Sequence, residues 1–265
     1  MNTEASAANI TSYEFEPFEL IFLQRRSEIL RLVGLTSYAL RSLKGSARLA
    51  KVLGKSDEEV NSAHEIETLA ATELKSDLPL LHSAAAVLIW GALETALRDF
   101  LVRWLVTYPS LLTRTQLKEV RIRVSEYESL TGEDRMRFLL GKLQDEFGRS
   151  STPGVSGFAS ILEIFSVNVT VASNAQRDLN ELAALRNVIV HRAGVADARL
   201  RELCPWLNVN VGDSVRINSS DLDRYVKSAS EYAAAVIMAA RDAAKTLPAR
   251  SAAAQLADPA AKQTK

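Results

Sequence analysis

One long apolar run constrains the fold of this chain more than any other feature. The run predicts a helix over residues 80–106, and Pro79 sits in its first turn, where a missing amide hydrogen costs little. His82 and Ser83 interrupt the run, and Glu94 follows within the same helix. The segment is therefore too interrupted for a membrane span, and it predicts a core helix with no membrane contact.

The rest of the chain favours helix as well. Apolar residues make up 47% of the 265 residues, while only 11 are Gly and 7 are Pro. Ala and Leu are abundant and carry the smallest helix penalty. Further helices are predicted over residues 18–53, 57–75, 113–130, 134–147, 158–165, 174–193 and 222–245. Alternating residues in 206–217 predict a small β-hairpin, so we expect an all-α bundle with a small β-hairpin before the last helix.

No shift in composition divides the chain into two compact domains. Residues 1–12 are polar, lack the pattern of a signal peptide and are predicted to be disordered. Residues 13–77 are predicted to form an N-terminal helical extension, and residues 78–246 the main helical domain. Residues 247–265 are Ala-rich and predicted to be a mobile tail.

Charge and cysteine content exclude several classes of protein. Lys and Arg total 32, as do Asp and Glu, so a protein that coats nucleic acid through bulk charge is not expected. The single cysteine, Cys204, cannot form an internal disulfide and is predicted to be a packed thiol in a cytoplasmic protein. Trp90, Trp104 and Trp206 are predicted to lie in the core. No cluster has metal-ligand spacing, so no metal or cofactor is expected.

The most informative segment is the predicted helix 174–193. Leu182, Leu185 and Ile189 recur at helical spacing and form one apolar stripe. Asn187 and His191 are four residues apart, so they share the opposite face.

Arg186 and His191 are the ionisable groups of this helix end. They lie about 140° apart on an ideal helix, so only the length of the arginine, or a distorted last turn, brings them together. Gly194 is predicted to close the helix in a left-handed cap.

The segment Arg186-Asn187-Val188-Ile189-Val190-His191 resembles the motif of the HEPN family (higher eukaryotes and prokaryotes nucleotide-binding domain). That motif is Arg, four to six residues, then His, often with Asn directly after the Arg. The helix around Glu94 resembles the earlier long helix of HEPN bundles, which presents a polar or acidic residue to the motif. The resemblance covers roughly residues 78–244 and leaves residues 1–77 unmatched.

This resemblance implies a HEPN-like bundle, a homodimer and metal-independent cleavage of RNA. It also implies the setting of a toxin or antiviral effector, with an antitoxin or other protein partner. It implies that Arg186 contacts the phosphate, His191 transfers protons, Asn187 orients the imidazole and Glu94 orients Arg186. Arg192, Arg199 and Arg201 follow the motif and are candidates for RNA binding.

Each of these residues also has an account without catalysis. Arg186 can pair with Glu181 or Glu94, and His191 is stabilised by its place at a helix C-terminus. Glu94 and Arg98 have the spacing of a surface ion pair. The arginines after the motif can form a solvated face. A non-catalytic, dimeric interaction or nucleotide-binding module of HEPN type therefore remains the alternative function.

Overall fold

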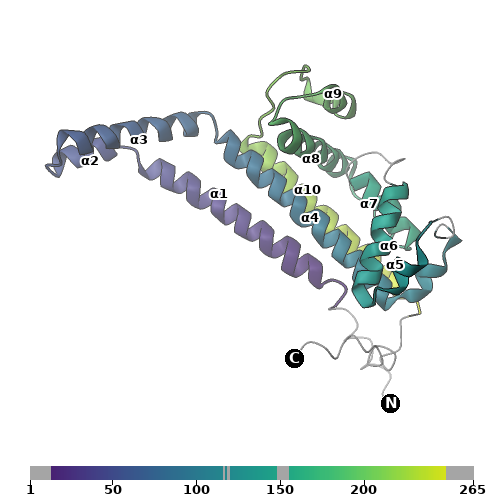
Figure 1. The fold of residues 1–265 in the computed structure, drawn as a ribbon. Helices are drawn as coiled ribbons and strands as arrows, with labels where there is room; N and C mark the ends of the chain where they lie inside the picture. The colour runs from purple at the N-terminus through teal and green to yellow at the C-terminus, as the bar shows by residue number, and fades with distance from the viewer. Residues whose placement is uncertain (1–12, 116, 118–119, 148–154, 249–265) are drawn as a thin grey trace, which may run out of the picture.

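The computed structural model describes residues 13–115, 117, 120–147 and 155–248, which form an all-α protein (Figure 1). The longer helices are α1 (Gln24–Ser42), α3 (Asp57–Lys75), α4 (Pro79–Thr107), α6 (Gly132–Phe147), α7 (Val155–Ile164), α8 (Ser173–Arg192) and α10 (Ser219–Ala244). The shorter segments are η1 (Phe18–Leu23), α2 (Ser46–Val52), η2 (Pro109–Thr113), α5 (Val124–Glu128), α9 (Ala198–Leu203) and η4 (Pro205–Leu207). The predicted disordered segment 1–12 and most of the predicted tail 247–265 lie outside the described residues.

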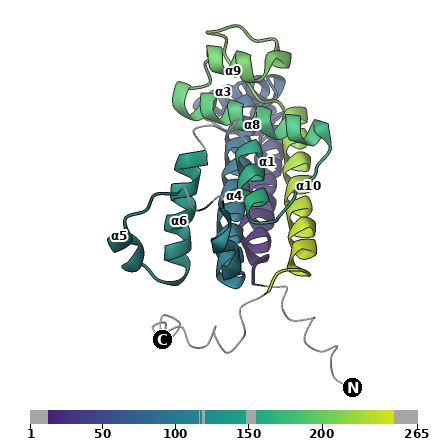
Figure 2. The same ribbon diagram turned by 90° about the vertical axis from the view of Figure 1, so that its right-hand side faces the viewer.

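Helix α4 is the centre of the bundle. The segments η1, α1, α6, α8 and α10 all pack against it, and Figures 1 and 2 show α1 and α10 running alongside it. Leu93, Leu97 and Phe100 of α4 are fully buried. By length and composition alone α4 could cross a membrane, but a core helix passes the same test. The predicted core helix is therefore observed, with its start at Pro79.

An aromatic row joins the N-terminal segment to this core. The ring centroids of Phe18 and Phe100 lie 5.4 Å apart, those of Phe100 and Trp104 5.6 Å, and those of Trp104 and Tyr108 4.3 Å. Tilted aromatic pairs at these distances add to the free energy gained by burial. One cluster of buried side chains extends from Phe15 in this segment to Ala240 in α10.

Helix α1 packs against α4 at its start and diverges from it toward its end, and with α2 and α3 it forms an arm that reaches beyond the bundle (Figure 1). The predicted helix 18–53 is broken at Gly45, whose φ of 86° suits glycine. Helix α3 begins as predicted. The Ser56 side chain accepts a hydrogen bond from the Glu59 amide, and the Glu59 carboxylate accepts one from the Ser56 amide, which makes a capping box.

Two predicted elements differ in the structure. Among the described residues of 113–130, the continuous helix is replaced by irregular backbone and the short α5. Val120, Ile122 and Val124 alternate with arginines there and offer no continuous apolar helical face, and a short helix needs such a face to be stable. The predicted loop 148–157 also ends early, because α7 already begins at Val155.

The predicted β-hairpin at 206–217 does not form, and no strand occurs among the described residues. Pro205 instead starts the 3₁₀ turn η4, and Asn208 adopts a left-handed conformation. The later half of the segment pairs with the residues that follow α8. Val195 and Ser214 form an isolated antiparallel bridge, and the Val215 amide donates to the Gly194 carbonyl over 2.7 Å. The alternating residues of 206–217 thus pair with the segment after α8 and not with each other.

Candidate active site

Helix α8 places the Arg186–His191 motif at its C-terminal end. Leu182 and Leu185 are buried against the bundle, and Ile189 is half-buried, so the predicted apolar stripe anchors the helix. Asn187 is partly exposed, and His191 is exposed. The motif therefore faces solvent while its helix is held by the core.

The end of α8 is fixed by two left-handed residues in succession. Ala193 has a φ of 50° and Gly194 a φ of 79°, so the predicted glycine cap begins one residue earlier, at an alanine. The amides of Ala193 and Gly194 both donate to the Val188 carbonyl, the latter over 3.1 Å. A Cβ atom on Gly194 would lie 3.4 Å from the Val215 carbonyl oxygen. The backbone directly after His191 is therefore held in place.

The structure brings Arg186 and His191 together. The Arg186 Nη1 atom lies 3.4 Å from His191 Nε2, and it also donates to Asn187 Oδ1 over 3.2 Å. The arginine side chain is long enough to bridge the angle between the two positions on the helix. One guanidinium group thus contacts both polar residues of the predicted motif.

The contact between Arg186 and His191 assigns roles to the two ring nitrogens. A guanidinium group has donors only, so the contact is a hydrogen bond when His191 Nε2 carries its lone pair. The imidazole is then neutral with its proton on Nδ1. In this form the Nε2 lone pair accepts from Arg186, and it can take a substrate proton once the guanidinium turns to a phosphate.

Of the two partners predicted for Glu94, the structure shows Arg98 and not Arg186. Its carboxylate accepts from Arg98 Nη2 at 2.9 Å, in an ion pair along the surface of α4. Within the described residues, Arg186 has no carboxylate within 4.0 Å, so it pairs with neither Glu94 nor Glu181. The guanidinium charge of Arg186 is consequently left without an anion.

The three arginines after the motif are exposed. Arg192 Nε lies 3.7 Å from Asp197 Oδ2, which offsets part of its charge. Arg199 and Arg201 project from α9, whose first turn is capped by the Asp197 side chain. Their side chains are accessible to a ligand, but no contact links them to Arg186.

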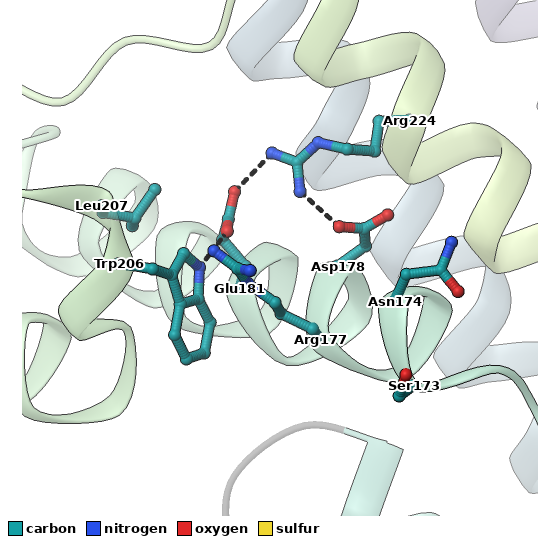
Figure 3. Close-up of a pocket in the computed structure, with 8 residues that line it drawn as sticks. All are labelled: Ser173, Asn174, Arg177, Asp178, Glu181, Trp206, Leu207 and Arg224. Carbon is teal, nitrogen blue, oxygen red and sulfur yellow. Dashed lines mark hydrogen bonds and ion pairs between the residues drawn. The ribbon is translucent and has the colours of Figure 1, made fainter.

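A buried ion cluster lies further back along α8 and was not anticipated from the sequence (Figure 3). Arg224 of α10 donates to the carboxylates of Asp178 and Glu181, the latter at 2.6 Å. Ser228 donates to Asp178 Oδ2 over 2.9 Å, and Tyr225 donates to Glu181 Oε1 over 2.5 Å. The cluster therefore ties α8 to α10.

The electrostatics of the cluster keep Glu181 ionised. Burial raises the pKa of Glu181, but hydrogen bonds from Arg224, Tyr225 and Trp206 outweigh burial, and the pKa lies below its ordinary value. Burial raises the pKa of Tyr225, and the neighbouring Glu181 raises it further. Tyr225 therefore remains a hydrogen-bond donor.

Trp206 differs from its predicted place in the core. It is 38% exposed, and its indole Nε1 donates to Glu181 Oε2. Trp90 and Trp104 are buried as predicted. Cys204 is buried, and burial raises the pKa of its thiol to about 12, which leaves little thiolate for chemistry.

A cleft of about 620 Å³ opens beside the buried cluster rather than at the motif. It is lined by residues of α8, α10 and the η4 turn, and Arg186 and His191 are not among them. Arg186 is half-buried and His191 is exposed, so the motif is accessible to a ligand.

No group of three or more His, Cys, Asp or Glu residues in the described part of the chain has the geometry to hold a metal ion. Comparisons of the chain with protein-family models, curated proteins and solved structures find no match. The HEPN resemblance of the motif therefore stays a prediction.

Proposed function

We propose that this chain is a metal-independent endoribonuclease of HEPN type. The observation that carries the proposal is the pair of half-buried Arg186 and exposed His191, whose side chains meet at 3.4 Å. Among the described residues the guanidinium has no carboxylate partner. A guanidinium fork without an anion suits a phosphate, and an exposed imidazole suits proton transfer.

The proposed reaction is attack of a ribose 2′-hydroxyl on the adjacent phosphorus. One His191 accepts the 2′-hydroxyl proton as the bond between O2′ and phosphorus forms. A second imidazole donates a proton to O5′ as the bond between phosphorus and O5′ breaks. The products are a 2′,3′-cyclic phosphate and a 5′-hydroxyl. Arg186 stabilises the charge that develops on the phosphoryl oxygens.

This reaction requires a homodimer, because one copy of the chain supplies one motif. Two copies related by a two-fold axis would place two His191 side chains, as base and acid, in one groove. Val190, directly before His191, is 47% exposed, so apolar surface adjoins the motif. Contact between copies near Val190 would also enclose the motif.

The arm offers a larger apolar surface for a second copy. Eight large apolar side chains on α1, α2, α3 and the turn after α2 are between 48% and 76% exposed. They are Leu32, Leu35, Tyr38, Leu49, Val52, Leu53, Ile66 and Leu69. Exposed apolar side chains that gather on one part of a molecule can indicate an interaction site. We therefore assign the arm to the dimer interface.

The charges of the arm are complementary to those of a second arm. Residues 24–55 hold eight basic residues and one acid, whereas residues 57–75 hold six acids and one lysine. In a two-fold arrangement, the basic α1–α2 part of one copy can face the acidic α3 of the other.

Charged substitutions on the arm should separate the dimer. The double variant Leu35→Glu and Tyr38→Glu is expected to shift the chain from dimer to monomer in light scattering, because both side chains are exposed on α1 and would be buried in the dimer. Met238→Glu, an exposed apolar position on α10, is the matched control and should remain dimeric. A wild-type chain that is monomeric at micromolar concentration would contradict the assignment.

The direct test of the activity uses bulk RNA in excess EDTA. We expect the purified chain to produce fragments with 2′,3′-cyclic phosphate ends, since no step requires a metal. Absence of cleavage at any protein concentration would remove the proposal.

The alternative is a non-catalytic module that binds a partner protein or a nucleotide. The ion pair of Glu94 with Arg98 favours this alternative, because the residue expected to orient Arg186 is engaged elsewhere. If the chain is instead an RNA-cleaving effector, it would act in the cytoplasm as a toxin or antiviral protein and would need an antitoxin or similar partner. An inactive chain that still dimerises would support the module.

A further inference from the structure

The cleft beside the buried cluster is built around one exposed aromatic ring (Figure 3). Trp206 lies in the η4 turn, and its indole nitrogen is bound to the buried carboxylate of Glu181. The guanidinium carbon of Arg177 lies 4.5 Å from the centroid of the indole ring. A hydrogen bond to a buried carboxylate thus fixes the edge of the indole ring, and the guanidinium group of Arg177 lies over one face of the ring.

The carboxylates of the cleft are not available to a ligand. The side chains of Asp178 and Glu181 are 10% and 2% exposed, and protein donors occupy both oxygens of each. Arg224 is 36% exposed at its side chain, and Arg177 is exposed. Asp178, Glu181 and Asp221 all pair with Arg224, so Arg177 is the cation that the cleft offers to a ligand.

The remaining lining residues add hydrogen-bonding groups and apolar surface. Ser173 and Asn174, from the first turn of α8, contribute a hydroxyl and an amide, and Leu207 contributes an apolar side chain. The cleft thus combines a planar stacking surface, cationic donors and neutral donors. This combination suits a ligand that has both a flat ring and an anionic group.

We propose that this cleft binds a nucleoside phosphate, either free or as one residue of single-stranded RNA. The base stacks on the pair formed by Arg177 and Trp206, because guanidinium and aromatic planes both accept bases. The phosphate receives hydrogen bonds from Arg177 and from the hydroxyl of Ser173. For the RNA case the inference rests on the proposed nuclease function, whereas for a free nucleotide it stands alone.

The cleft is separate from the cleavage motif. Arg177 and His191 are 14 residues apart on α8, which corresponds to about 21 Å along a helix axis. A nucleotide in the cleft is therefore not the one whose phosphate meets His191. In an RNA substrate it would hold the strand at a distance from the scissile bond.

Tryptophan fluorescence offers a test that does not depend on RNA cleavage. Trp90 and Trp104 are buried, so a soluble ligand should quench chiefly Trp206. We expect saturable quenching by 5′-AMP, and at least tenfold weaker binding of adenosine alone or inorganic phosphate alone. Wild-type protein with no saturable response to either 5′-AMP or an oligoribonucleotide would overturn the proposal.

Variants locate the binding. Arg177→Gln should weaken 5′-AMP binding at least tenfold while leaving the fold intact, because Arg177 is exposed and lies outside the buried hydrogen-bond network. Arg123→Gln is the matched control on an exposed arginine far along the chain, and it should bind as wild type does. Equal binding by Arg177→Gln and wild type would overturn the proposal.

Two further measurements distinguish free nucleotide from RNA as the ligand, and the cleft proposal from the nuclease proposal. A single-stranded oligoribonucleotide is titrated into His191→Ala, which should not cut it. Tighter Arg177-dependent binding of the oligomer than of 5′-AMP assigns the cleft to RNA, and the reverse order assigns it to a free nucleotide. If wild-type protein cuts no RNA but still binds 5′-AMP through Arg177, the nuclease proposal fails and the cleft proposal stands.

Discussion

Replacing His191 by Ala is expected to lower the rate of RNA cleavage by about 10²–10⁴-fold, which is the usual contribution of a general acid or base. The proposed dimer loses both imidazoles at once, so the larger end of this range is expected. His191 is exposed and lies outside the core, so the variant should keep the stability of wild type. The measurement is the rate of formation of cyclic-phosphate ends in EDTA.

Arg186→Ala should lower the same rate by about 10²–10³-fold, because it removes donors aimed at developing negative charge. Arg186→Lys should recover only part of the loss, since lysine keeps the charge but not the planar fork. His64→Ala changes an exposed histidine on α3 and is the matched control. If the His191→Ala and Arg186→Ala variants both cut RNA as fast as wild type does, the motif has only a structural role.

Local signals in the sequence were sufficient to predict the main helices. The start of α3 follows from Ser56 and Glu59, whose side chains satisfy each other's backbone amides within four residues. The start of α4 follows from Pro79, which suits a first turn. Both signals act between residues close in the chain, so no tertiary contact was needed to read them.

The candidate motif was predicted as a set of residues but not as a geometry. An ideal helix separates Arg186 from His191 by about 140°, and the 3.4 Å contact depends on the side-chain conformation that the arginine adopts. The mispredicted hairpin has a related cause. Its alternating residues carried no information about their partner, which proved to be the segment after α8 rather than the neighbouring half of the same loop.

The buried cluster shows a further limit of sequence reasoning. Asp178 and Glu181 are three residues apart on α8, but their cation, Arg224, comes more than 40 residues later. Acids at this spacing usually mark a solvated helix face. Only the packing of α10 against α8 converts them into a buried network that also orients Trp206.

Replacing Arg224 by Leu is expected to lower the free energy of unfolding by about 3 kcal/mol at pH 7, because it leaves Asp178 and Glu181 buried without a counter-charge. The value is taken at the low end of the range for broken buried pairs, since Arg224 is itself 36% exposed and partly screened by water. Urea denaturation of both proteins measures the difference. Arg25→Leu breaks an exposed ion pair with Glu28 and should change stability by less than about 1 kcal/mol.

The loss of stability in Arg224→Leu should depend on pH, and the pKa of Glu181 determines the direction of this dependence. That pKa is lower in the folded chain than its ordinary value of 4.5, so the stability it contributes is present above about pH 4.5 and is lost as the pH falls through the lowered value. A protonated carboxyl no longer needs the guanidinium. In Arg224→Leu the guanidinium no longer offsets the burial of Glu181, which raises its pKa, so the difference between wild type and variant should begin to shrink above pH 4.5 and continue to shrink as the pH falls further. A difference that stays constant with pH would mean that Arg224 stabilises the helix pair through packing of its side chain rather than through its charge.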